Sequence, residues 1–179
     1  MISLEAPRGL SDWWRLYRLY ISAFPPAERK PFSIIWKMYR EGKSQVLCIR
    51  QDGIFAGMMT TILSPELILL DYFAMEKHCR GKGLGTAALK EFLDRNSGTG
   101  VFLEIESTKE DCPDLEAREK RKRFYENCGL EPLNVYAEVF GVNMELLGRN
   151  CHLDFDGYYR FYRDQYSPWA AEHIRRTEM

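Results

Sequence analysis

A short, basic, glycine-rich stretch is the part of this sequence best suited to bind an anion. Arg80-Gly81-Lys82-Gly83-Leu84-Gly85-Thr86 follows the apolar run Leu67–Met75. Glycine lets the backbone approach a ligand closely, and the start of a helix presents free N–H groups at the positive end of its dipole. Two basic side chains, Arg80 and Lys82, add positive charge. The stretch therefore predicts a phosphate site.

Two carboxylates stand close together further along the chain. Period-two alternation places Glu104 and Glu106 on one face of the strand predicted over Val101–Glu106. Because burial of an unpaired charge is costly, we expect them to face a cleft, to pair with a cation or to hold raised pKa values. A purely structural alternative is that these carboxylates form ion pairs with Arg118 or Arg121.

The elements that would position these residues follow from hydrophobic periodicity and turn signals. An Asp52-Gly53 hairpin joins the second and third strands, and the strand–helix–strand unit around the glycine-rich stretch requires a parallel neighbour. Strands are predicted near residues 2–4, 45–50, 54–63, 67–75, 101–106, 133–140 and 142–147. Helices are predicted from Ser11 or Asp12 to Phe24, over 33–41, from Leu84 to about Arg95, from Cys112 to Asn127, and from Asp154 or Asp156 to Pro168. These elements predict an α/β (α+β) fold with a mixed, mostly antiparallel sheet flanked by helices.

Length and composition restrict the classes of partner. The chain has 179 residues and a formal net charge of −1, so nothing in it favours a nucleic-acid or membrane partner. The N-terminus has no signal-peptide pattern. An odd number of cysteines, five, with no zinc spacing, indicates free thiols in a cytoplasmic protein rather than a disulfide framework or a metal site.

The glycine-rich stretch has three possible interpretations. It does not supply the G-x-x-x-x-G-K-[ST] pattern of a P-loop. Residues 83–88 read G-x-G-x-x-A with Glu104 about 20 residues on, as in a dinucleotide fingerprint, but they follow an antiparallel meander instead of opening a β-α-β unit. In the third interpretation, Arg80–Gly85 has the form [QR]-x-x-G-x-[GA], which resembles the acetyl-CoA-binding motif of the GNAT superfamily of N-acetyltransferases.

The resemblance to the GNAT superfamily covers nearly the whole chain. Arg123–Leu130 resembles the second hallmark of that family, a tyrosine before a helix-ending glycine, and the order of the elements is similar. The Leu103–Glu106 strand and the basic helix resemble a bacterial branch with no general substrate assignment. The resemblance implies an N-acetyltransferase domain over residues 1–150, with residues 151–179 as a helical tail packed on the same domain.

Family resemblance also implies roles for particular residues. The CoA pyrophosphate would lie on Arg80, Gly81, Lys82, Gly83, Leu84, Gly85 and Thr86, and the pantetheine arm beside the backbone of Phe73, Ala74 and Met75. Transfer of the acetyl group needs a neutral amine and a protonated leaving thiolate. Tyr125 is the expected acid, and Glu104 and Glu106 are the candidate bases. No residue suggests a metal.

The acceptor is expected to be a primary amine of a small molecule or peptide, attacking directly in a ternary complex. Glu28 and Arg29, in the proline-rich stretch Phe24–Phe32, are candidate acceptor-binding residues. Alternatively, this stretch only connects two helices. The protein is expected to be a monomer or homodimer. Two other functions remain open, a catalytically silent CoA-binding regulatory module and a dinucleotide-binding protein.

Overall fold

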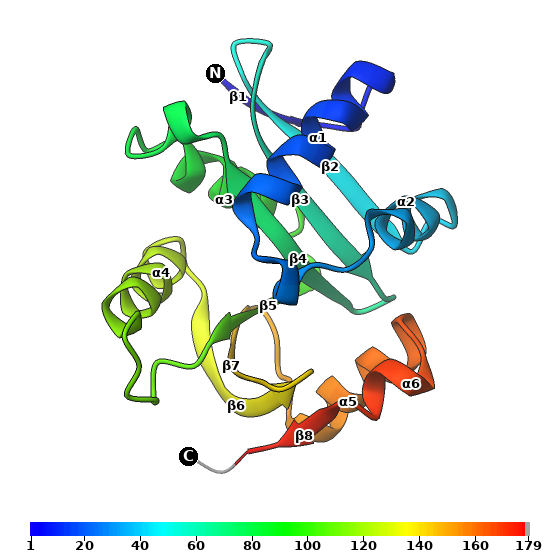
Figure 1. Cartoon of the computed structure of the whole chain (residues 1–179), viewed down its shortest axis with the longest axis vertical. Coiled ribbons are helices and arrows are strands. Elements are labelled where there is room, and N and C mark those ends of the chain that lie inside the picture. Colours follow the sequence, from blue (N-terminus) through cyan, green and yellow to red (C-terminus); the bar gives the residue numbers. More distant parts are fainter. Residues whose placement is uncertain (178–179) are drawn as a thin grey trace. The chain divides into compact units, whose positions relative to one another are not determined.

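Eight strands form one sheet in the order β1-β2-β3-β4-β5-β7-β6-β8, in a computed structural model that describes residues 1–177 (Figure 1). β4 and β5 run parallel where Leu67–Leu69 face Gly100–Phe102. The pairs β1–β2, β2–β3, β5–β7, β6–β7 and β6–β8 are antiparallel. The strands are β1 Ile2–Glu5, β2 Ser44–Gln51, β3 Ile54–Leu63, β4 Leu67–Met75, β5 Gly100–Glu106, β6 Glu131–Val139, β7 Val142–Arg149 and β8 Ile174–Arg176. The predicted mixed, mostly antiparallel sheet flanked by helices is confirmed.

Helices separate the strands in the expected order. They are α1 Leu10–Ala23, α2 Phe32–Arg40, α3 Leu84–Arg95, α4 Leu115–Asn127, α5 Phe155–Gln165 and α6 Pro168–Ala171, with 3₁₀ turns at Pro26–Glu28 and Lys77–Cys79. The chain divides into two compact units, one made of Met1–Leu63 and Leu70–Arg95, the other of Ser64–Leu69 and Asn96–Met179. β4 contributes residues to both units.

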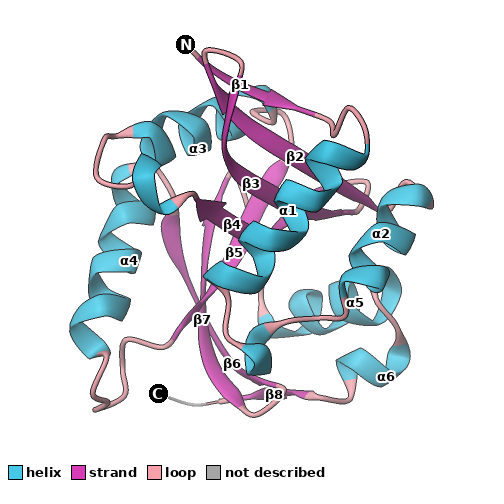
Figure 2. Ribbon diagram, turned by 45° about the horizontal axis from the view of Figure 1, so that its top comes forward, coloured by secondary structure: helices cyan, strands magenta, loops and turns pink. Residues whose placement is uncertain are grey.

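The core of the first unit lies between two helices and the sheet. α1 and α2 cover one face of the strands of this unit (Figure 2). α1 buries Leu16, Leu19 and Tyr20 there, and α2 buries Ile35. Burial of each such side chain stabilises the fold by about 1.5–3 kcal/mol. β2, β3 and β4 contribute Val46, Cys48, Phe55, Met58, Tyr72 and Ala74 to the same cluster.

The core of the second unit includes the contact between α5 and β5. The ring of Phe102 lies 6.2 Å from the ring of Tyr158 and 5.0 Å from that of Phe161. α5 begins with a side-chain cap, since Asp154 accepts a hydrogen bond from the Gly157 N–H at 2.8 Å. The predicted cap at Asp154 is confirmed.

Two tight hairpin turns, Asp52-Gly53 and Phe140-Gly141, have the same backbone conformation. Asp52 and Gly53 have φ values of 50° and 83°, and Phe140 and Gly141 have φ values of 49° and 84°. A two-residue turn with both φ values positive matches the twist of the strands it joins. The Asp-Gly signal therefore located the first hairpin correctly.

Two predicted helix starts were wrong, and two short elements were not predicted. α1 begins after Gly9, and Asp12 is not its cap but a buried residue whose carboxylate accepts from the Arg8 N–H and pairs with Arg50 at 2.6 Å. α4 begins at Leu115 instead of near Pro113, because Asp114 occupies the N-cap position. The elements α6 and β8 were not predicted, since four and three residues are too few to show a period.

Within residues 1–177 no helix combines the length and apolar character that a membrane crossing requires. Over the same range, His, Cys, Asp and Glu side chains form no group of three arranged to hold a metal ion.

Candidate active site

The glycine-rich stretch joins β4 to α3 in the first unit, as predicted. Gly81 and Gly83 have φ values of 72° and 73°, in the left-handed region that favours glycine. The first described hydrogen bond of α3 is donated by Ala87 to the Gly83 carbonyl at 3.0 Å. The amides of Leu84, Gly85 and Thr86 therefore precede the hydrogen-bonded part of the helix, where N–H groups have no intrahelical acceptor. This is the arrangement that binds phosphate at a helix N-terminus.

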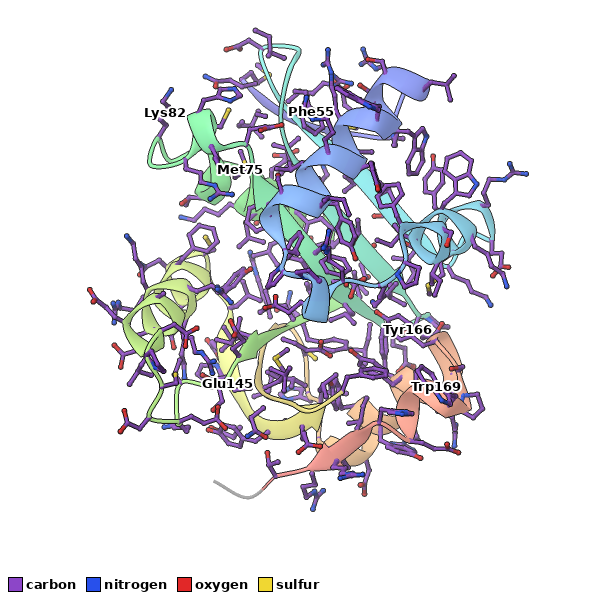
Figure 3. All side chains as sticks on the ribbon, in the orientation of Figure 1. Phe55, Met75, Lys82, Glu145, Tyr166 and Trp169 are labelled. Carbon is purple, nitrogen blue, oxygen red and sulfur yellow. The ribbon has the colours of Figure 1, made fainter. Side chains whose placement is uncertain are left out.

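The basic residues of this stretch border those amides. Figure 3 shows Met75 at the end of β4 and Lys82 on the loop that follows. Nε of Arg80 donates to the Met75 carbonyl at 3.0 Å, which ties the loop to the end of the strand. Arg80 and Lys82 are exposed, whereas Ala74 and Met75 are buried. The structure thus brings together the residues predicted to bind CoA.

Tyr125 lies near the end of α4 in the second unit. Its ring contacts that of Phe124 at a centroid distance of 5.2 Å. Burial raises the pKa of Tyr125 to about 12, and the positive charge of Arg121 acts in the opposite direction. The phenol therefore keeps its proton at neutral pH and can act as a proton donor.

Glu104 meets the C-terminal helix α5. Its Oε1 accepts hydrogen bonds from Tyr158 at 2.5 Å and from Tyr162 at 2.7 Å. Tyr158 is fully buried, and burial together with the negative charge of Glu104 raises the pKa of its phenol well above the ordinary value. Tyr158 is therefore a permanent donor to this carboxylate.

Glu106 meets a different helix. Its two oxygens lie 3.3 Å from Nη2 of Arg118 and 2.6 Å from Nη1 of Arg121, both on α4. The plain alternative, pairing with these two arginines, is confirmed for Glu106. On the same strand, Glu104 thus accepts from two phenols, and Glu106 pairs with two guanidinium groups.

Sequence reasoning missed a third carboxylate, Glu145 on β7. Its side chain is 3% exposed and accepts from Lys122 Nζ at 2.6 Å. Thr108 donates to the other oxygen from its N–H at 2.9 Å and from its hydroxyl at 2.6 Å. Burial acts to raise the pKa of Glu145, but these hydrogen bonds and the charge of Lys122 outweigh it and hold the pKa below its ordinary value. A single carboxylate inside the apolar strand Val142–Leu147 was the available signal, since such a charge must be paired.

The proline-rich stretch is hydrogen-bonded to the body of the first unit. Tyr72 donates to the Glu28 carbonyl at 2.8 Å and accepts from the Lys30 N–H at 3.2 Å. Tyr20 donates to the Lys30 carbonyl at 2.9 Å, and Lys30 Nζ lies 2.6 Å from Asp71. The backbone around Glu28 and Arg29 is therefore fixed by two buried tyrosines.

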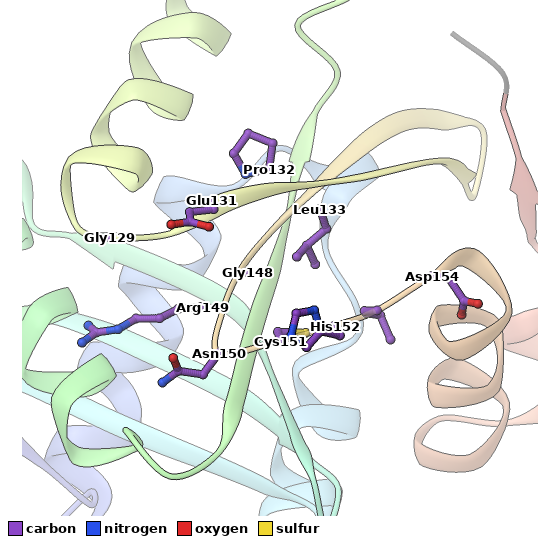
Figure 4. A pocket seen from close by; sticks show the side chains of 11 residues that line it. Gly129, Glu131, Pro132, Leu133, Gly148, Arg149, Asn150, Cys151, His152 and Asp154 are labelled. Carbon is purple, nitrogen blue, oxygen red and sulfur yellow. The ribbon is translucent and has the colours of Figure 1, made fainter.

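A cavity of about 900 Å³ in the second unit contains none of the predicted site residues (Figure 4). Its lining mixes acidic, basic and apolar groups without a common chemistry. The lining residues are Gly129, Glu131, Pro132, Leu133, Gly148, Arg149, Asn150, Cys151, His152, Leu153 and Asp154.

Solved structures resemble this fold along most of the chain. A protein from Bacteroides thetaiotaomicron assigned to the GNAT family has a TM-score of 0.77 and 19% identity, over 93% of this chain and 98% of its own. The Arabidopsis thaliana Naa50 structure, in complex with the bisubstrate analogue CoA-Ac-MVNAL, has a TM-score of 0.65 and 15% identity, over 84% of this chain and 99% of its own. Spermidine N-acetyltransferase from Vibrio cholerae, in complex with CoA and spermine, has a TM-score of 0.63 and 13% identity, over 83% and 94%.

The sequence itself carries the family assignment. A search of curated proteins finds no match to this chain. The sequence model described as the acetyltransferase (GNAT) family matches residues 13–130, more than half of the chain. Its match spans both the glycine-rich stretch and the Tyr125 segment. The chain therefore belongs to the GNAT family of acetyltransferases.

Proposed function

We propose that the protein transfers an acetyl group from acetyl-CoA to a primary amine of a small molecule or peptide, by direct attack within a ternary complex. The observation that carries the proposal is the geometry of residues 80–86. Two left-handed glycines lead into a helix whose first amides precede its hydrogen-bonded part, beside two exposed cations. This arrangement suits the CoA pyrophosphate.

The end of β4 would hold the rest of the donor. Backbone groups of Phe73, Ala74 and Met75 would bond the amides of the pantetheine arm, and an N–H in this region would polarise the thioester carbonyl. The hydrogen bond from Arg80 to the Met75 carbonyl fixes the glycine-rich stretch relative to the end of β4. One continuous segment, residues 73–86, would thus bind both the pyrophosphate and the pantetheine arm of the cofactor.

Tyr125 would supply the proton for the leaving thiolate. The described structure gives its hydroxyl no hydrogen-bond partner within residues 1–177, so the proton is available to a ligand. Its pKa of about 12 keeps it protonated at the pH at which a thiol of ordinary pKa, about 8.5, leaves as thiolate. The phenolate formed would be a strong base and would recover a proton from the acetylated nitrogen. The net transfer is one proton from nitrogen to sulfur.

Glu104 and Glu106 are the candidate bases that would neutralise the attacking ammonium. Both oxygens of Glu106 are occupied by ion pairs with the guanidinium groups of Arg118 and Arg121. Glu104 accepts hydrogen bonds from the neutral phenols of Tyr158 and Tyr162, and hydrogen bonds from neutral donors are weaker than those from guanidinium groups. We therefore favour Glu104, with Glu28 and Arg29 as candidate acceptor contacts.

Two of the similar structures support an amine as the acceptor. The names of two similar structures refer to a peptide-like bisubstrate analogue and to spermidine N-acetylation. By the same likeness, acetyl-CoA is the proposed donor, and no metal is proposed. Residues 151–177, which form α5, α6 and β8, are proposed to be part of the same functional domain.

A thiol-release screen with acetyl-CoA tests the proposal. Polyamines, amino acids, aminoglycosides and peptides would be offered as acceptors, and each product would be checked by mass for one added acetyl group. Tyr125→Phe should bind acetyl-CoA normally and turn over about 10²-fold more slowly. Binding of CoA without thiol release from any amine would instead identify a silent CoA-binding module.

A further inference from the structure

The helix that carries Tyr125, α4, contacts the sheet through a face that includes charged side chains. α4 buries no residue completely, and most of its side chains are polar. Its half-buried side chains include Leu115, Arg118, Lys122 and Tyr125, which are spaced by three, four and three residues and therefore share one face. An amphipathic helix normally turns an apolar stripe inward, but two of these four residues are cations.

The central contact of this face is the ion pair between Lys122 and Glu145. Lys122 Nζ lies 2.6 Å from Oε2 of Glu145, and 3.4 Å from the Thr108 hydroxyl. Thr108 holds the other carboxylate oxygen with two hydrogen bonds, as described above. The Glu145 carboxylate is therefore held by its place on β7 and by Thr108 in the loop after β5, in addition to its contact with α4.

Arg118 adds a second anchor one turn earlier. Its side chain is 13% exposed and lies 3.3 Å from Glu106 and 3.4 Å from Glu110. It also donates to the Ser107 carbonyl at 3.2 Å. Arg118 and Lys122, one turn apart, therefore both bind acceptors on the same side of α4.

We infer that the Lys122–Glu145 ion pair, with Thr108, positions the hydroxyl of Tyr125 for proton transfer. The inference rests on the proposed role of Tyr125. Apolar contact is non-directional and lets a helix slide or turn, whereas a short ion pair fixes both its rotation and its height. Tyr125 stands three residues after Lys122, one turn along the same face, so the position of Lys122 determines where the phenol lies.

Glu145→Gln tests the inference against a matched control. Glu119 also pairs with a cation of α4, Arg123 at 3.3 Å, but on the exposed side of the helix. We expect Glu145→Gln to lower kcat about tenfold or more, because small misplacements of a catalytic group are costly, with the Kd for acetyl-CoA changed less than about twofold. Glu119→Gln should leave both constants unchanged. An unchanged kcat in folded Glu145→Gln would overturn the inference.

A double-mutant cycle separates positioning from general stability. In the Tyr125→Phe background, Glu145→Gln should change kcat less than about twofold, because the group it positions is gone. Independent losses that multiply in the double variant would show that Glu145 acts by another route. If Glu145→Gln does not fold, Thr108→Val, which removes one hydrogen bond to Glu145, replaces it in the cycle.

Hydrogen exchange on the amides of residues 115–127 tests whether the ion pair anchors α4, and it requires no activity measurement. We expect faster exchange in Glu145→Gln and not in Glu119→Gln. Unchanged exchange would refute the anchoring itself. Faster exchange together with a fully active Tyr125→Phe variant would instead refute the proposed role of Tyr125, so the two failures are distinguishable.

Discussion

The hydroxyl of Tyr158 lies 2.5 Å from Oε1 of Glu104, which links the C-terminal helix α5 to the middle of β5. Tyr162, one turn further along α5, donates to the same oxygen at 2.7 Å. Two neutral donors on one oxygen stabilise the carboxylate anion and fix its orientation. A base at Glu104 would therefore be preorganised by residues outside the matched family region, 13–130.

Tyr158→Phe should destabilise the protein and change its pH–rate profile. Loss of a hydrogen bond to a charged group is expected to lower the free energy of unfolding by about 1.5–3 kcal/mol. If Glu104 is the base, the acid limb of kcat/KM should move to higher pH, because the carboxylate then holds a proton more tightly. Urea denaturation and a pH–rate series measure the two effects. Tyr159→Phe, the next residue on α5, is the control and should change neither.

Tyr72→Phe should loosen the proline-rich stretch. The variant removes the donor to the Glu28 carbonyl, and we expect a loss of about 1–2 kcal/mol in the free energy of unfolding. If Glu28 and Arg29 contact the acceptor, KM for the amine should rise while KM for acetyl-CoA stays constant. Equal changes in both constants would argue against an acceptor role. Tyr17→Phe, an exposed tyrosine of α1, is the matched control.

Gly57→Ala should disturb the end of β4. A Cβ at this position would lie 2.6 Å from the Ala74 carbonyl oxygen and 2.8 Å from Sδ of Met75, so the backbone of β4 must shift. We expect a loss of about 1–3 kcal/mol in stability and weaker binding of CoA, measured by thermal unfolding and calorimetry. Gly98→Ala, where a Cβ meets no atom within 4 Å, should behave as wild type. Wild-type CoA affinity in folded Gly57→Ala would show that this strand end does not contact the cofactor.

Stability should fall in acid because two buried carboxylates have lowered pKa values. Hydrogen bonds from Lys122 and Thr108 lower the pKa of Glu145 against the effect of burial, and the Arg8 N–H and Arg50 do the same for Asp12. A lowered folded-state pKa adds stability that is fully present above the ordinary values of 4.5 and 3.8, and is lost as pH falls through the folded values. Urea unfolding at a series of pH values measures the loss. In Glu145→Gln the slope below pH 4.5 should be shallower than in the parent chain.

Local signals in the sequence were sufficient for most of the sheet. The apolar run Leu67–Met75 gave the bounds of β4 correctly, and Asp52-Gly53 gave the first hairpin, because both depend on neighbouring residues alone. The glycine-rich stretch was placed correctly between β4 and α3 for the same reason. Its position after an antiparallel meander, instead of at the opening of a β-α-β unit, also agrees with the structure and does not favour the dinucleotide interpretation.

Contacts between distant segments could not be predicted from the sequence. Tyr158 and Tyr162, which donate to Glu104, are more than fifty residues away from it, and nothing in their spacing points to that carboxylate. Asp12 was mistaken for a cap because capping and buried pairing use the same side chain, and only the fold brings Arg50 beside it. Partner choice at long range depends on topology, which local periodicity does not contain.

The outermost strands of the sheet influence how copies of this protein can associate. β1 has four residues and β8 has three, and β8 exposes Arg175 and Arg176. Short strands with exposed charge are poor templates for backbone pairing with another chain. We therefore expect the protein to resist edge-to-edge aggregation, and any specific self-association to use helix surfaces instead of a sheet continued from one molecule into the next.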